Sequence, residues 1–145
     1  MSERKITDEE QGLIDKAGKF LAGGGQNGKA DVIIHRGKGG RVWDLSGNEY
    51  IDFQLGSGPM LVGHVHPEVV AAVREQIDLG TTFMANNQHA VRLAEEIVSA
   101  VPSAEKVRFS SSGAEATFFA MRAARAYRKR DKILKFEGAF HGMND

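Results

Sequence analysis

Cysteine is absent from the 145-residue sequence, and its absence excludes several kinds of site. A chain without thiols has no disulfide framework, no cysteine-ligated zinc site and no thiol nucleophile, and it fits a reducing compartment. An excess of charge of either sign is also lacking, because 19 Lys and Arg residues balance 19 Asp and Glu residues. A net charge of zero gives no reason to expect a nucleic acid or an anionic membrane as a partner.

Long apolar runs are missing as well. No segment approaches the roughly 20 residues that a membrane-spanning helix requires. The N-terminal sequence MSERKITDEE is charged, unlike the apolar core of a secretory signal. We therefore expect a cytoplasmic protein without a membrane partner. Hydrophobic residues make up 41% and charged residues 26% of the chain, which is typical of a globular protein.

Helix and strand signals alternate along the chain. Thr7 and Glu10 have capping-box spacing and predict a helix that ends at the glycines 23–25, with a loop at 23–31. Apolar periodicity predicts further helices that begin at Pro67, Gln88 and Ala114 and end near Gly80, Ala100 and Arg128. Alternating residues on either side of a Ser-Gly-Asn turn predict a hairpin of strands 41–45 and 49–53.

Two short strands, at 106–109 and 132–136, flank the last helix. Strand, helix and strand in this order predict a βαβ unit and therefore a parallel sheet. Because such a sheet is covered on both faces, we expect the chain to be part of a larger α/β protein. The alternative is a small complete α+β domain.

The junction between strand 106–109 and the following helix is the most informative stretch. Ser112 and Glu115 have capping-box spacing, and Gly113 allows a ligand to approach the backbone closely. Free amides at a helix N-terminus attract anions, and phosphate above all. The alternative is a well-capped helix without a ligand. The stretch matches neither the P-loop nor the dinucleotide motif, which weakens a third reading as a nucleotide-binding α/β protein.

A second glycine-flanked segment follows strand 132–136. It carries Phe140 and His141 between Gly138 and Gly142. Because the carboxyl ends of parallel strands meet at one sheet edge, we expect these side chains to lie near Ser112 and Gly113. Phe140 has the shape to stack on a planar ring, and His141 has nitrogens for a hydrogen bond. The alternatives are an aromatic that plugs the core and a structural histidine.

Four segments resemble the class III, fold-type I pyridoxal-phosphate-dependent aminotransferases, and in particular their glutamate-1-semialdehyde aminomutase-like members. They are residues 40–52 (GRVWDLSGNEYID), 63–67 (GHVHP), 107–116 (VRFSSSGAEA) and 132–142 (KILKFEGAFHG), in the family's order and spacing. The resemblance runs from about residue 33 to the end. It implies an N-terminal segment at residues 1–62, with the hairpin, and the start of the large parallel-sheet cofactor domain at 63–145.

The resemblance also implies roles for individual residues. Gly113 and Ala114 would bind the phosphate of pyridoxal 5'-phosphate through backbone N–H groups, with Ser112 at the turn. Phe140 would stack on the pyridine ring, and His141 would lie beside it. The segment 55–59 would face the substrate entrance with Ser57. No residue in the chain is implied as catalytic or as a metal ligand.

Three positions depart from the family pattern. Many relatives have Thr at the position of Ala114, and some have Tyr at the position of Phe140. Aminomutase-like members have Trp where this chain has Ser57. A hydroxyl contact at Ala114 and a phenol at Phe140 are thus absent. A substrate-side aromatic is absent at Ser57, so the resemblance does not decide between aminotransferase and aminomutase.

The implied function is amino-group transfer by a longer enzyme, of which this is the N-terminal part. The family's Schiff-base lysine lies beyond residue 145, so we expect these residues alone to be inactive. The expected partners are a small amino-group donor, a carbonyl acceptor and, in the full-length form, a second copy of the chain. The alternative is a non-catalytic truncated paralogue that binds a phosphate ligand or serves in dimerisation.

Overall fold

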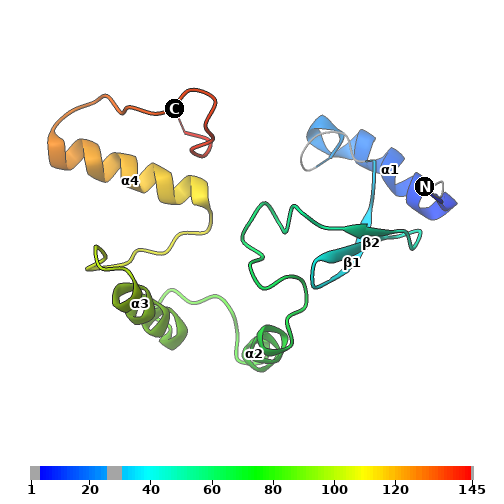
Figure 1. The fold of residues 1–145 in the computed structure, drawn as a ribbon, viewed down its shortest axis with the longest axis horizontal. Coiled ribbons are helices and arrows are strands. Elements are labelled where there is room, and N and C mark those ends of the chain that lie inside the picture. The colour runs from blue at the N-terminus through cyan, green and yellow to red at the C-terminus, as the bar shows by residue number, and fades with distance from the viewer. Residues whose placement is uncertain (1–3, 26–30, 145) are drawn as a thin grey trace. The chain divides into compact units, whose positions relative to one another are not determined.

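The computed structural model describes residues 4–25 and 31–144. Its elements are α1 (Asp8–Phe20), the 3-10 helix η1 (Ala22–Gly24), β1 (Ile34–Lys38), β2 (Arg41–Asp44), β3 (Glu49–Ile51), α2 (Pro67–Ile77), α3 (Gln88–Ala100) and α4 (Gly113–Arg128) (Figure 1). They fall into two compact units, Met1–Thr82 and Phe83–Asp145, and each is described by itself. The division into functional domains at 1–62 and 63–145 stays a prediction.

All of the predicted helices form, and local chemistry sets where they begin. Thr7 caps α1 by accepting a hydrogen bond from the Glu10 N–H (3.3 Å). Pro67 occupies the first turn of α2, where its missing N–H costs nothing. Asn87 caps α3 by accepting from the His89 N–H at 2.8 Å. The predicted loop at 23–31 falls partly on residues 26–30, which lie outside the described residues.

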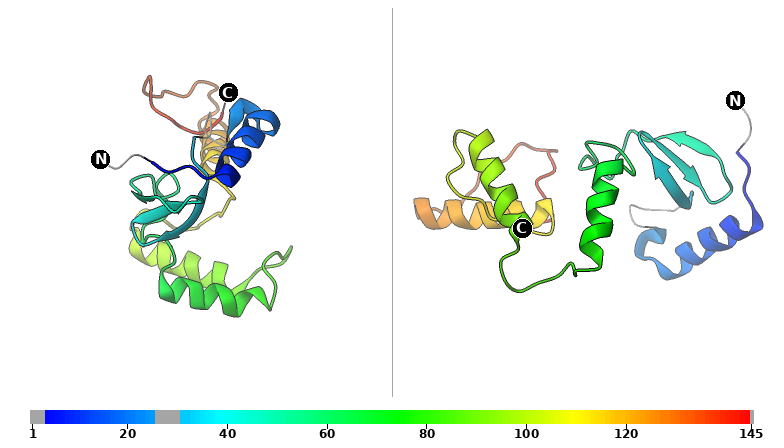
Figure 2. Two further views of the ribbon diagram at one scale, coloured as in Figure 1. Left: turned by 90° about the vertical axis from the view of Figure 1, so that its right-hand side faces the viewer. Right: turned by 90° about the horizontal axis from the view of Figure 1, so that it is seen from below.

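The sheet is antiparallel and has the order β1-β2-β3. Its strands are drawn as cyan arrows in Figure 2. The predicted hairpin is β2 and β3, with Val42 opposite Tyr50 and Trp43 opposite Glu49. β1, which was not predicted from the sequence, pairs with β2 and has a register shift between Ile34 and Arg36. No apolar alternation marks the sequence IHRGK of β1. The extended conformation of β1 is therefore stabilised by its pairing with β2 and not by its own residue pattern.

The strands predicted at 106–109 and 132–136 are not formed in this structure. Among the described residues, the antiparallel sheet holds every named strand, and neither segment belongs to it. Leu134 and Phe136 are 99% and 83% exposed. A parallel strand forms only beside a hydrogen-bonded neighbour and under cover on both faces. Within 4–25 and 31–144 neither segment has these partners, so the prediction of a paired βαβ unit is not met here.

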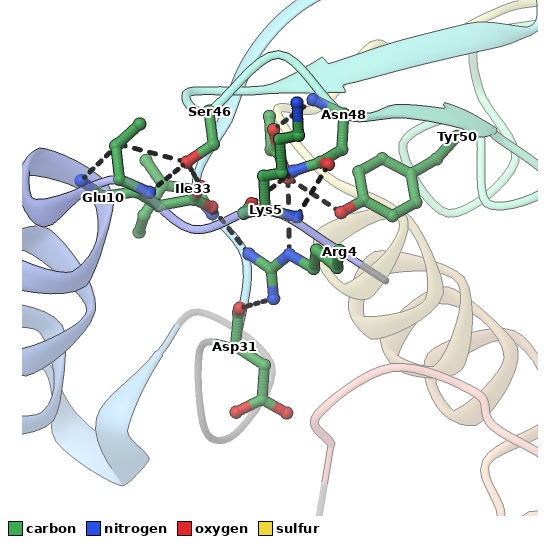
Figure 3. Close-up of polar contacts among 10 residues, drawn as sticks. Arg4, Lys5, Glu10, Asp31, Ile33, Ser46, Asn48 and Tyr50 are labelled. Carbon is green, nitrogen blue, oxygen red and sulfur yellow. Dashed lines mark hydrogen bonds and ion pairs between the residues drawn. The ribbon is translucent and has the colours of Figure 1, made fainter. Parts of the chain in front are cut away.

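The buried centre of the first unit is polar (Figure 3). Glu10 and Asp44 are 0% and 1% exposed. Among the described residues, Ala17 is the one buried hydrophobic side chain. Arg4 lies between the two carboxylates, donating to Glu10 at 2.7 Å and to Asp44 at 3.4 Å. This cluster ties the N-terminal segment and α1 to the sheet, because its members come from all three.

Neutral donors complete the shell of the two buried carboxylates. Asp44 accepts hydrogen bonds from the Tyr50 hydroxyl (2.7 Å) and from the backbone and side chain of Asn48 (2.7 and 2.8 Å). Burial raises the pKa of Asp44, but the hydrogen bonds from Asn48 and Tyr50 outweigh it and hold that pKa below its usual value. Glu10 accepts from Ile33 N–H at 3.0 Å and from Ser46, and its pKa is lowered despite burial in the same way.

Candidate cofactor-binding site

The N-terminus of α4 has the geometry expected of an anion site. Ser112 is extended, with φ −151° and ψ 161°, and its Oγ accepts from the Glu115 N–H at 3.2 Å. The Glu115 carboxylate in turn accepts from the Ser111 N–H at 2.7 Å. The predicted capping pair is therefore confirmed. It fixes the backbone on both sides of the turn and uses two of the donors there.

The next two amides along this turn stay available to a ligand. Within the described part of the chain, the N–H groups of Gly113 and Ala114 have no hydrogen-bond partner. A Cβ added at Gly113 would meet nothing within 4 Å. The turn therefore presents two donors, the positive end of a helix dipole and open space in front of its glycine, which together suit a phosphate group.

The segment that carries Phe140 and His141 lies against the first turn of α4. Gly142 has φ +88°, and a Cβ on it would lie 2.8 Å from the Cα of Ala114 and 2.8 Å from the Oγ1 of Thr117. This approach is possible only for glycine. The structure thus brings the segment that carries Phe140 and His141 to the N-terminal end of α4, and Figure 1 shows this red C-terminal segment beside the yellow start of the helix.

Two polar side chains that belong to no predicted site connect these parts. The Asn144 amide nitrogen donates to Thr117 Oγ1 at 2.9 Å and to the His141 carbonyl at 2.8 Å. The Thr117 hydroxyl lies 3.0 Å from the Ala114 carbonyl and 3.1 Å from that of Gly113. The signal for Thr117 is its position one helical turn after Gly113. No comparable sequence signal marks Asn144.

Phe140 is 82% exposed and His141 is also exposed. The Phe140 ring therefore does not plug a core in this structure, and its faces are accessible to a planar ligand. Its stacking role stays a prediction, as does the hydrogen-bonding role of His141.

Ser57 belongs to the other compact unit. It lies in a turn of four residues with left-handed backbone, with φ 43° at Leu55, 66° at Gly56, 68° at Ser57 and 108° at Gly58. An L-residue in this region costs roughly 1–2 kcal/mol. The surrounding chain therefore has to hold the turn in place.

Asp52 and His64 hold the base of this turn. One Asp52 carboxylate oxygen accepts from the N–H groups of Gln54 and Leu55 at 2.9 and 3.0 Å. The other lies 2.6 Å from Nε2 of His64, whose backbone exchanges two 2.9 Å hydrogen bonds with Gly39. The hydrogen bond with His64, together with that from Leu55, lowers the pKa of Asp52. The loop that carries Ser57 is thereby anchored to the edge of the sheet.

The described residues hold neither a membrane-spanning helix nor a cluster of metal ligands. Outside the undescribed positions, no helix combines the length and the apolar character needed to cross a membrane. Within the same residues, no three or more His, Asp or Glu side chains gather in a way that would hold a metal ion.

The chain is similar to known proteins along most of its length. The family model for class III aminotransferases matches residues 24–145. A glutamate-1-semialdehyde 2,1-aminomutase of Sulfurihydrogenibium azorense is 44% identical over 141 residues, which cover 92% of this chain and 33% of the relative. One of Fusobacterium nucleatum is 48% identical over 119 residues, 82% of this chain and 27% of the relative. The chain thus spans about a third of the length of the curated relatives it matches.

Solved structures give the same picture. An omega-transaminase from Sphaerobacter thermophilus superposes with a TM-score of 0.86 at 34% identity, covering 93% of this chain and 32% of that one. A structure described as a transaminase with PLP bound superposes with a TM-score of 0.89 at 37% identity, covering 98% of this chain and 35% of that one.

Proposed function

The chain belongs to the class III aminotransferase family, and from this membership we propose that it forms the N-terminal part of a pyridoxal-phosphate-dependent aminotransferase or aminomutase. The superpositions with transaminases, at TM-scores of 0.86 and 0.89, confirm the predicted fold class. The predicted resemblance to aminomutase-like members is confirmed by relatives of that name at 44% and 48% identity. Cofactor binding and amino-group transfer by this protein are the parts that we propose.

The residues present fit pyridoxal phosphate at the end of α4. The free amides of Gly113 and Ala114 would take the phosphate, with Ser112 keeping the turn extended. The exposed ring of Phe140 would cover one face of the pyridine, and His141 would lie beside it. When bound, the cofactor supplies an electron sink for carbanion chemistry, while the protein supplies binding and orientation.

The single observation that carries this proposal is the pairing of an open anion turn with an aromatic segment packed against it. Gly142 approaches Ala114 closely, so the segment that carries Phe140 lies against the turn proposed to bind the phosphate. Phosphate and planar ring are the two chemical features of pyridoxal phosphate. A phosphate ligand without a ring would need only the turn.

The nucleophile of the reaction is not assigned to a residue of this chain. Lys132 and Lys135 lie in the segment that the family uses as a strand, and we give neither a catalytic role. We propose that a lysine in further sequence of the full-length protein supplies the nucleophile, so that these 145 residues alone do not transfer amino groups. A small amino donor, a carbonyl acceptor and a homodimer are proposed for that full-length form.

The turn is tested by placing a side chain in it. In the full-length protein, Gly113→Val fills space that is open in this structure. We therefore expect weaker retention of pyridoxal phosphate on dialysis without a loss of apo-protein stability, because valine is no poorer a helix former than glycine. The matched control is Gly12→Val, at another helical glycine with nothing within 4 Å of its Cβ position. Unchanged cofactor content in Gly113→Val would contradict the assignment, and loss in both variants would indicate a general effect.

A further inference from the structure

Asn144 spans the gap between the two halves of the proposed site. One half is the phosphate turn with Gly113 and Ala114, and the other is the segment with Phe140 and His141. The Asn144 amide nitrogen donates at 2.8 Å to the His141 carbonyl, in the peptide group between His141 and Gly142. It donates at 2.9 Å to Thr117 Oγ1, one turn into α4.

Thr117 carries the connection on to the phosphate turn. Its hydroxyl has one proton and lies 3.0 and 3.1 Å from the carbonyls of Ala114 and Gly113. The same oxygen accepts from Asn144, so the hydroxyl is used as donor and acceptor at once. A continuous path of hydrogen bonds therefore runs from the Ala114 peptide to the His141 peptide.

We propose that Asn144 and Thr117 are positioning residues for the cofactor, and that they set the distance between its phosphate anchor and the ring-binding segment. The proposal rests on the proposed function and deepens it. We call the two side chains the Asn144–Thr117 bridge. Neither side chain is assigned a contact with the cofactor.

The chemistry of the bridge demands these residue types. The nitrogen of Asn144 gives both of its N–H groups, one to a carbonyl and one to a hydroxyl. A carboxylate in its place would offer no donor and would face the His141 carbonyl with like partial charge. Gly142 lies inside the bridge, and a Cβ there would be 2.8 Å from the Asn144 nitrogen as well as from α4. The hydrogen bonds of Asn144 thus hold the segment with Phe140 and His141 against α4. Gly142 makes this close approach possible because it has no side chain.

A positioning role for the bridge predicts different effects on two ligands, which a role in fold stability alone would not predict. Phosphate alone needs only the turn, whereas pyridoxal phosphate needs the turn and the ring segment at a fixed separation. Breaking the bridge should therefore weaken pyridoxal phosphate binding and leave inorganic phosphate binding unchanged. It should also change the circular dichroism of the bound cofactor, which depends on the orientation of its ring.

The experiment uses the full-length protein, prepared without cofactor. Dissociation constants are measured for pyridoxal phosphate and for inorganic phosphate in Asn144→Ala, Thr117→Val and the double variant. Thr117→Ser, which keeps the hydroxyl, is the conservative control. We expect the dissociation constant for pyridoxal phosphate to rise by about two- to twelvefold in each single variant, the range that one net hydrogen bond gives. The double variant should lose no more than the worse single variant, because both changes break one connection.

Distinct results would overturn the proposal. Equal losses for pyridoxal phosphate and inorganic phosphate would show that Thr117 only supports the turn. Additive losses would show that the two side chains act separately. Wild-type affinity and dichroism in Asn144→Ala would show that no positioning occurs. If a variant unfolds, Asn144→Asp together with Thr117→Ser decides the question, since the first breaks and the second preserves the bridge. A wild-type protein that binds no pyridoxal phosphate would refute the proposed function itself, and the bridge with it.

Discussion

Replacing Arg4 by methionine tests whether the polar centre of the first unit holds the N-terminal segment to the sheet. Arg4 is the cation between Glu10 and Asp44, which are 0% and 1% exposed. Methionine keeps much of the apolar stem and removes the charge. Both carboxylates then stay buried without a counter-charge, which is costly in a medium that solvates ions poorly.

The magnitude follows from the exposure of the cluster. Removing one partner of a fully buried pair costs about 3–5 kcal/mol. The Arg4 side chain is 28% exposed, and neutral donors such as Tyr50 and Asn48 stay in place on Asp44. We therefore expect a loss of about 2 kcal/mol, which is roughly a thirtyfold increase in the local opening constant.

Hydrogen exchange of the full-length protein measures this loss locally. The most direct probes are the amides of Ile33 and Asn48, which donate to Glu10 and to Asp44. The control is Arg41→Met, which breaks the ion pair with Glu49 between side chains that are 54% and 44% exposed. An exposed pair contributes about 0–1 kcal/mol. Equal effects of the two substitutions at these amides would refute the reasoning.

The same cluster gives a pH dependence with a definite sign. The pKa values of Glu10 and Asp44 are lowered in the folded chain. Their stabilisation is therefore present above the unfolded carboxyl pKa of about 4 and is lost as the pH falls through the folded values. Without Arg4 those values rise, so protection of the Ile33 and Asn48 amides should fail at a higher pH in Arg4→Met than in the wild type.

Three further predictions concern the site and the chain as a whole. The isolated 145-residue chain should aggregate or remain partly molten, because faces such as that of α2 expose Val69, Val73 and Ile77; a cooperative unfolding transition from a soluble monomer would contradict this. In the full-length protein, Phe140→Ala should weaken pyridoxal phosphate binding about two- to twelvefold while Phe140→Tyr should be nearly neutral; a loss of apo stability with unaltered affinity would contradict stacking. Gly142→Ala should weaken cofactor binding more than Phe140→Ala, because its Cβ would lie 2.8 Å from the Ala114 backbone; titration of the apo protein with cofactor checks it, and unchanged affinity would contradict it.

Local chemistry explains which elements could be predicted from the sequence. Thr7, Pro67 and Ser112 each satisfy or remove donors at a helix start, and each does so in the structure. The hairpin is likewise local, because its turn residues and alternating strands are adjacent in sequence. Such signals act within a few residues and need no distant partner.

The elements that were missed depend on strand pairing or on buried ion contacts. β1 has no apolar alternation and forms by pairing with β2 across the two residues Gly39 and Gly40. The segments 106–109 and 132–136 have strand-like composition, yet no neighbour pairs with them among the described residues. Glu10 is predicted as a capping residue, but its carboxylate is buried between Arg4 and Ser46. The pairing of parallel strands and the formation of ion clusters are decided by tertiary contacts, which local patterns do not encode.

The candidate site divides in the same way. Ser112, Gly113 and the Phe140-His141 segment were found because motifs mark them, and the structure brings them to one end of α4. Asn144 was not found, because its role depends on a hydroxyl of Thr117 that is distant in sequence.

The left-handed turn at Ser57 limits which side chains can stand at the position that we expect at the substrate entrance. With φ at +68°, position 57 accepts glycine, asparagine or aspartate readily and a bulky side chain only with strain. Replacing Ser57 by tryptophan, the residue that the resemblance implies for aminomutase-like members, would therefore strain this backbone. A bulky residue at position 57 would require changes along the whole loop between Asp52 and His64. The ends of that loop are held by the Asp52 carboxylate and the His64 imidazole.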